Sequence, residues 1–137
     1  MKTKTSSKDL DLSSNEILNI SKGSPFKPKN INNLKPSNFK LFSFKAGFKK
    51  NSKDLLILIF DKTTNVESMY SLTSMPSAPI IWDKKNNKGK CKALIINSGN
   101  ANAHTGKEGI NIIDKYVSEL AKKINCKKNE ILVSSTG

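Results

Sequence analysis

Two short apolar runs, each ending in a polar loop, constrain this sequence most. Residues 93–96 (ALII) lead into a loop of small and polar residues, and residues 131–133 (ILV) stop at the small residues 134–137 (SSTG). A helical pattern lies between them. The succession of strand, loop, helix, strand and loop is how an α/β protein presents backbone amides at the ends of its strands. We therefore predict an α/β (α+β) fold with a mixed sheet and packed helices.

The segment between the two runs predicts an amphipathic helix. Thr105 and Glu108 match a capping box, in which each side chain accepts a hydrogen bond from the backbone amide of the other residue. Lys122 and Lys123 complement the negative end of a helix dipole. The helix is expected from about Gly106 to Asn125. Its apolar residues follow the spacing of three and four positions that an α-helix requires: Ile110, Ile113, Val117, Leu120 and Ile124.

The loop before this helix, residues 97–106 (NSGNANAHTG), is rich in residues that tolerate unusual backbone conformations. Asn and Gly adopt left-handed conformations, and Asn side chains bond to neighbouring backbone groups. The composition predicts a tight turn held by its own hydrogen bonds, and an ordinary strand-to-helix connection explains it equally well. A phosphate site is less favoured, because the sequence has neither a dinucleotide fingerprint nor a P-loop. The residues concerned are Asn97, Ser98, Gly99, Asn100 and Asn102.

These motifs resemble a known family. The loop NSGNANAHTG, followed by a helix and then by ILVSSTG at residues 131–137, closely resembles the ornithine acetyltransferase (glutamate N-acetyltransferase) family of arginine biosynthesis. Residues 44–49 (FKAGFK) and 54–59 (DLLILI) are similar to the family's opening strands. Residues 77–82 (SAPIIW) are similar to the start of its first helix. The resemblance covers about residues 40–137 and implies the N-terminal part of the family's α-subunit fold.

The resemblance implies a reaction and its partners. Family members move an acetyl group from N-acetylornithine to glutamate through an acyl-Thr intermediate. The precursor cuts itself before a Thr, which begins the β-subunit, and the freed amine can activate the Thr hydroxyl as a base. That Thr has no counterpart in this chain, so the chain alone is expected to be inactive. The implied partner is the β-subunit of the same precursor, in a heterotetramer of two α and two β chains.

The resemblance also implies residue roles. Thr136 and Gly137 match a Thr-Gly pair that stabilises the oxyanion, an effect worth about 3–4 kcal/mol per donor. The Asn-rich residues named above would shape the site. The sequence departs from the family at residues 71–75 (SLTSM), where the family has a Thr-rich motif, and at His104, where members carry another small residue. No cofactor is implied, and whether acetyl-CoA also serves as an acetyl donor is left open.

The cysteine and histidine content limits other chemistry. Cys91 and Cys126 are too few for a disulfide framework, and with the single His104 they form no metal set of familiar spacing. No sequence context supports a Cys–His nucleophilic pair. No stretch approaches the ~18 apolar residues of a membrane span. The first residues carry neither a signal-peptide segment nor the Arg-rich pattern of a transit peptide, so we expect a cytoplasmic protein.

The net charge of +13 raises the alternative of a Lys-rich nucleic-acid-binding module. All 24 basic residues are Lys, so the bidentate Arg side chains that favour phosphates and guanines are missing. Lys, Asn and Ile together are also what an AT-rich genome encodes. Residues 1–53 hold 12 Lys and 3 acidic residues, whereas residues 54–137 hold 12 Lys and 8 acidic residues. Nucleic-acid binding is therefore less favoured, and a degenerate, non-catalytic remnant is a third alternative.

We divide the chain into two parts. Residues 1–38, rich in Lys, Asn and Ser, predict a flexible extension, and residues 39–137 an acetyltransferase-like α/β domain. The expected elements of the domain are an antiparallel pair of strands at residues 39–48 and 55–60, a polar turn at 61–65, a strand at 66–73, and a short helix from Pro79 to Lys84 with Trp82 packed on the sheet.

Overall fold

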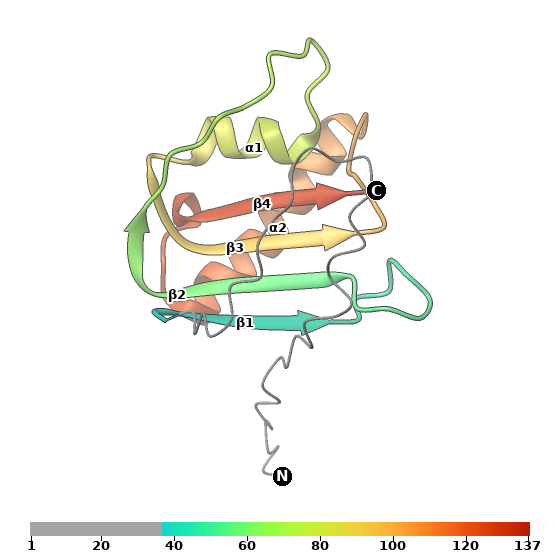
Figure 1. The fold of residues 1–137 in the computed structure, drawn as a ribbon. Helices are drawn as coiled ribbons and strands as arrows, with labels where there is room; N and C mark the ends of the chain where they lie inside the picture. The colour runs from blue at the N-terminus through green and yellow to red at the C-terminus, as the bar shows by residue number, and fades with distance from the viewer. Residues whose placement is uncertain (1–36) are drawn as a thin grey trace, which may run out of the picture. The chain divides into compact units, whose positions relative to one another are not determined.

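A four-stranded sheet is the centre of the structure (Figure 1). The computed structural model describes residues 37–137, so the predicted extension lies almost wholly outside the described residues. The strands lie in the order β1-β2-β3-β4. Along the described part of the chain the elements are β1 (Phe39–Phe44), β2 (Leu55–Asn65), α1 (Ala78–Asn86), β3 (Lys90–Ser98), α2 (Gly106–Ile124), the short 3₁₀ helix η1 (Lys128–Glu130) and β4 (Ile131–Thr136).

The sheet is mixed, as the sequence predicts. β1 pairs with β2, and β2 with β3, in antiparallel fashion. β3 and β4 are parallel, with Ala93 opposite Ile131 and Ser98 opposite Thr136. Parallel neighbours need a crossover connection, which α2 provides. Both the predicted antiparallel pair and the α+β fold class are confirmed.

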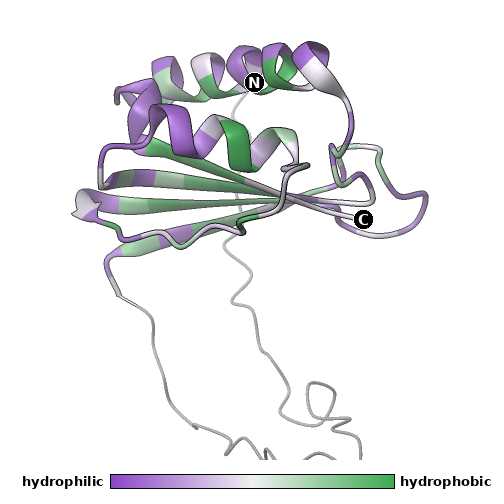
Figure 2. Ribbon diagram, turned by 90° about the horizontal axis from the view of Figure 1, so that it is seen from above, coloured by the Kyte–Doolittle hydropathy of each residue, from purple (hydrophilic) through white to green (hydrophobic). Residues whose placement is uncertain are grey.

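Both α-helices cover the same face of the sheet (Figure 2). In α2 the apolar stripe faces the sheet, and Ile113 and Val117 have no exposed surface. Trp82 of α1 is buried in the same core, as predicted. The side chains enclosed between the helices and the sheet are Ala78, Trp82, Ala93, Ile95, Ile113, Val117, Ala121, Ile131 and Val133.

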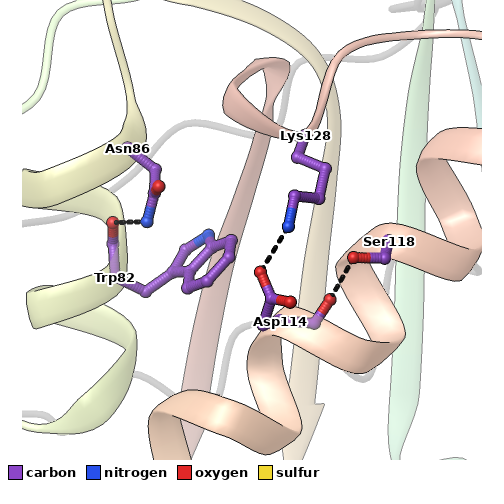
Figure 3. A network of polar contacts seen from close by, with 5 residues as sticks. All are labelled: Trp82, Asn86, Asp114, Ser118 and Lys128. Carbon is purple, nitrogen blue, oxygen red and sulfur yellow. Dashed lines mark hydrogen bonds and ion pairs between the residues drawn. The ribbon is translucent and has the colours of Figure 1, made fainter.

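Polar contacts join α1, η1 and α2 beside this core (Figure 3). The Lys128 Nζ atom lies 2.5 Å from a carboxylate oxygen of Asp114 and 5.9 Å from the centre of the Trp82 ring. Asn86 donates to the carbonyl of Trp82, and Ser118 donates to that of Asp114. Because Lys128 and Asp114 are both about half exposed, their pairing contributes less than ~1 kcal/mol. The buried apolar contacts therefore hold the helices in place.

The connection between β2 and α1 corrects two predictions. Residues 61–65, predicted as a turn, belong to β2, because Thr64 and Asn65 pair with the start of β3 after an irregularity in the register. Residues 66–73, predicted as a strand, form none. Strand propensity is realised only against a neighbouring strand, and residues 66–73 pair with no strand in the described part of the chain. Met69 and Leu72 are almost fully exposed there.

The helix predictions agree with the structure. α1 spans the predicted Pro79–Lys84 with Pro79 in its first turn, where the missing amide costs nothing. α2 begins at Gly106 and ends at Ile124, one residue before the predicted end. Asn125 closes it in the left-handed conformation, with φ of 53°, a common C-cap. Within residues 37–137 no helix has the length and apolar character needed to cross a bilayer.

Candidate active site

The candidate site lies where the parallel strands β3 and β4 end side by side (Figure 1). Ser98 is opposite Thr136 in the register, and the Gly99 amide donates to the Thr136 carbonyl at 2.9 Å. The Asn-rich loop thus begins beside the last residues of β4. The structure therefore brings together the two groups of residues that the sequence singled out, residues 97–102 and residues 136–137.

Hydrogen bonds within the loop use the side chain of Asn97. Its amide nitrogen donates to the carbonyl of Asn100 at 2.7 Å. Its side-chain oxygen accepts from the Ser135 hydroxyl at 2.5 Å, which ties β3 to β4. Next in the loop, the Asn100 side-chain oxygen accepts from the backbone amide of Asn102 at 2.8 Å. The Asn residues therefore build the loop, as the predicted self-bonded turn requires.

The predicted capping box at Thr105 and Glu108 is wrong. The backbone of Thr105 lies in the helical region, with φ −92° and ψ −3°, and its side chain makes no capping bond. The hydroxyl instead donates to the Asn102 side-chain oxygen at 2.6 Å. A residue that is itself helical cannot present its hydroxyl to the following amides as a cap does. The Thr105 side chain bonds to Asn102 instead of capping the helix. The Glu108 carboxylate therefore has no part in a capping box.

Left-handed backbone conformations make the loop tight. Gly99 has φ of 99°, Asn102 of 48° and His104 of 57°. A side chain at Gly99 would also approach the backbone oxygen of Phe48 to 3.2 Å, so the glycine permits close contact with Phe48 and Lys49. His104 is a loop residue, as predicted. Its positive φ is uncommon for residues other than glycine.

Asp54 supports the Asn-rich loop, a structural role that the sequence analysis missed. It is buried immediately before β2, and its carboxylate accepts hydrogen bonds from the backbone amides of Ala46, Gly47 and Lys49. These hydrogen bonds, that of Ala46 foremost, hold the pKa of the carboxyl below its usual value. The Asp54 carbonyl accepts the Ser98 amide at 2.8 Å. Asp54 thus places the turn after β1 against the start of the loop. The sequence did carry one signal for this role, an acidic residue between the Lys-rich residues 49–53 and the apolar residues 55–60.

A cavity of about 540 Å³ opens beside the loop and along α2. Phe48 forms part of one wall, and the polar residues of the loop form another. Burial raises the pKa of the phenol of Tyr116, which also lines the cavity. The lining residues are Phe48, Asn97, Asn100, Asn102, His104, Thr105, Glu108, Gly109, Ile112 and Tyr116.

A second carboxylate lies against the outer edge of β4. Asp83 of α1 is buried, and both its oxygens accept the Val133 amide, at 3.2 and 3.3 Å. Burial raises the pKa of Asp83 to about 7, although the hydrogen bond from Val133 acts in the opposite direction. A cavity of about 400 Å³ lies beside it and is lined in part by Ser134 and Ser135. Asp83 therefore supports the strand that ends at the candidate site.

The cysteines lie away from this site. Cys91 is buried at the start of β3, the opposite end of the strand from the loop, and Cys126 follows α2. Burial raises the pKa of both thiols, which disfavours the reactive thiolate. Within residues 37–137 no group of three or more His, Cys, Asp or Glu side chains is arranged to hold a metal ion.

The ArgJ family model matches residues 40–137, which include the candidate site and every described element apart from the first residue of β1. The chain belongs to the ArgJ family. The arginine biosynthesis bifunctional protein ArgJ of Bradyrhizobium diazoefficiens is 38% identical over 117 residues, covering 83% of this chain and 28% of the relative. ArgJ of Caldanaerobacter subterraneus is 34% identical over 103 residues, which cover 74% of this chain and 26% of the relative.

Solved structures of ArgJ proteins share the fold. ArgJ of Bacillus halodurans aligns with a TM-score of 0.69 and 28% identity over 74% of this chain and 54% of its own. The ornithine acetyltransferase of Mycobacterium tuberculosis, solved with ornithine, aligns with a TM-score of 0.65 and 25% identity. The alignment covers 74% of this chain and 57% of that structure's chain. The chain thus spans roughly a quarter of the curated ArgJ relatives and about half of these solved chains.

Proposed function

We propose that this chain is part of a glutamate N-acetyltransferase of arginine biosynthesis, which moves an acetyl group from N-acetylornithine to glutamate. The observation that carries the proposal is the position of Thr136 and Gly137 at the carboxyl end of β4, beside the Asn-rich loop. Membership of the ArgJ family and the name of the ornithine acetyltransferase that shares the fold support it.

The backbone geometry favours an oxyanion site at these two residues. The Thr136 carbonyl accepts the Gly99 amide, so it points toward β3. In a planar trans peptide the following N–H points the opposite way. The Gly137 amide is therefore directed away from β3 and is free of the sheet ladder. Together with the exposed Thr136 side chain, it offers two donors to a developing negative charge.

The proposed reaction needs a nucleophile from a second segment, the β-subunit. Its N-terminal Thr hydroxyl would attack the acetyl carbonyl while its amine takes the proton. The tetrahedral oxyanion would be held by Thr136 and Gly137, and its collapse would release ornithine and leave an acyl-Thr. The amino group of glutamate would then take the acetyl group. The assembly proposed is two α and two β chains in the cytoplasm, with acetyl-CoA as a second candidate donor.

A chimera tests this proposal. Residues 40–137 would replace the matching segment of the Bradyrhizobium diazoefficiens ArgJ protein, which supplies the remaining parts of the enzyme. We expect N-acetylglutamate to form from N-acetylornithine and glutamate, and the same scaffold without the segment serves as the control. Replacing N-acetylornithine by acetyl-CoA asks whether the second donor is used. A soluble, folded chimera that forms no N-acetylglutamate from N-acetylornithine would overturn the proposal.

A further inference from the structure

The last residues of β4 are bonded to the β3 end and its loop at two places besides the regular ladder. The Ser135 hydroxyl donates to the side-chain oxygen of Asn97 at 2.5 Å. One residue further on, the Thr136 carbonyl accepts the Gly99 amide at 2.9 Å. The peptide between Thr136 and Gly137, which carries a proposed oxyanion donor, is therefore anchored at the residue before it and at its own carbonyl.

The second anchor also depends on Asn97. The side-chain nitrogen of Asn97 donates to the Asn100 carbonyl at 2.7 Å and so closes the turn that contains Gly99. Gly99 has a left-handed backbone in this turn, with φ of 99°, and from there its amide reaches the Thr136 carbonyl. One side chain thus serves both anchors. Its oxygen holds Ser135, and its nitrogen holds the turn that presents Gly99.

The side chains of Asn97 and Thr136 lie on opposite faces of the sheet. Ile95 and Val133, two residues before Asn97 and Ser135, are buried in the core beneath the helices. Because side chains alternate along a strand, Asn97 and Ser135 belong to the helix face, and Thr136 belongs to the face that the described helices leave open (Figure 2). Asn97 is therefore placed to act through Ser135, and not on a group held by the Thr136 hydroxyl.

We propose that Asn97 is a positioning residue for the oxyanion site, with Ser135 as its partner on β4. The proposal rests on the proposed function, because the strand end that Asn97 fixes is the proposed oxyanion site. Hydrogen-bond donors stabilise an oxyanion when their direction is set before the charge develops. A displacement of about 1 Å can lower a rate about 100-fold. Loss of either anchor should therefore lower kcat and leave substrate binding nearly unchanged.

The two anchors can be removed separately. Asn97→Asp keeps an acceptor for the Ser135 hydroxyl but has no N–H to donate to the Asn100 carbonyl, so it weakens the turn alone. Ser135→Ala removes the direct link and leaves the turn intact. Asn97→Ala removes both links. We therefore expect Asn97→Ala to have the largest effect of the three.

The kinetic test uses the chimera described above. We expect Asn97→Ala to lower kcat about 30-fold or more, and Ser135→Ala about 10-fold, with KM within about twofold of the parent. Ser135→Thr retains the hydroxyl and should stay near the parent. Adding Ser135→Ala to Asn97→Ala should lower kcat little further, because the two side chains act as one unit.

Ser118→Ala is the matched control for these variants. Like Ser135, Ser118 is part-buried, and its hydroxyl makes a short hydrogen bond, here to the Asp114 carbonyl within α2. We expect the control to keep the kcat of the parent. A folded Asn97→Ala chimera with kcat within about twofold of the parent, or one in which KM rises while kcat is unchanged, would overturn the positioning role.

Amide hydrogen exchange in the ¹⁵N-labelled 137-residue chain tests the geometry without the reaction. The Gly99 amide reports on the second anchor, and the Val133 amide, bonded to Asp83, reports on β4 before its end. We expect Asn97→Ala, and less strongly Ser135→Ala, to speed exchange at Gly99 by about tenfold and to leave Val133 unchanged. Unchanged exchange at Gly99, or an equal increase at both amides, would overturn the proposal.

The two experiments separate this inference from the proposed function. An inactive, folded parent chimera together with selective loss of protection at Gly99 would refute the acetyltransferase and retain Asn97 as the residue that positions the end of β4. An active parent chimera whose kcat does not change in Asn97→Ala would retain the acetyltransferase and refute the positioning role.

Discussion

At the scale of single residues, Gly109 has a role that its position inside a helix conceals. The side chains of Asn102 and Thr105, bonded to each other at 2.6 Å, lie over this residue. A Cβ atom at position 109 would come within 2.0 Å of the Thr105 hydroxyl and 2.5 Å of the Asn102 side-chain oxygen. Glycine costs about 1 kcal/mol relative to alanine inside a helix. Here it lets the Asn-rich loop fold back onto α2.

We predict that Gly109→Ala lowers the free energy of unfolding by about 1–3 kcal/mol, because the loop must move to admit the methyl group. Helix propensity alone predicts the opposite sign. Urea denaturation of the chain measures the difference. Asn111→Ala, on the exposed face of the same helix, is the matched control and should stabilise by about 0.5 kcal/mol. A Gly109→Ala variant more stable than the parent would mean that the loop does not pack on α2 in this way.

At the scale of elements, Asp83 connects α1 to the edge strand β4. Its carboxylate accepts the Val133 amide, which points out of the sheet where a further strand would bond. This contact satisfies a donor on the open edge and fixes β4 three residues before Thr136. Tyr116 and Cys91 are close enough for the charge of Asp83 to raise the pKa of both. Burial itself makes ionisation of Asp83 unfavourable in the folded protein.

The pKa of Asp83 predicts how stability changes with pH. Because the carboxyl titrates near pH 7 in the folded chain and near 3.8 in the unfolded chain, the folded state holds its proton longer. Its contribution to stability is complete below pH 3.8, falls as the pH rises toward 7, and is absent above it. We expect this contribution to span about 2–4 kcal/mol.

Asp83→Asn isolates this contribution, because the amide keeps an acceptor for Val133 and does not titrate. Urea denaturation of both proteins between pH 4 and 8 should show the parent losing stability relative to the variant as the pH rises. Parallel stability curves for the two proteins would contradict a titration of Asp83 in this range.

Some of these elements can be predicted from the sequence, and others cannot. The apolar stripe of α2 and the Asn-rich loop are local patterns, so their period and composition predict them well. Asp83 bonds to Val133, which lies fifty positions later in the chain and which only the fold brings near. No local pattern encodes such contacts. The capping box failed because Asn102, outside the motif, binds Thr105, and the strand predicted at residues 66–73 failed because it has no partner.

At the scale of the whole molecule, the two faces of the sheet differ. The described helices cover one face only (Figure 2). Alternation along the strands places Leu56, Leu58, Leu94 and Ile96 on the other face, where they are partly buried. The positive charge of the chain is likewise uneven, since the cavity at the candidate site has no Lys. A nucleic-acid-binding module remains the competing prediction, and it requires an affinity that falls steeply with salt.

The most direct test of the account is the effect of Thr136 on acetyl transfer by the chimera. Thr136→Val removes the hydroxyl at nearly constant shape, whereas Thr136→Ser retains it. If Thr136 stabilises the oxyanion, Thr136→Val should lower kcat about 100-fold with little change in KM, and Thr136→Ser should stay near the parent. A folded Thr136→Val chimera with kcat within about twofold of the parent would contradict the central claim that this end of β4 stabilises the transition state.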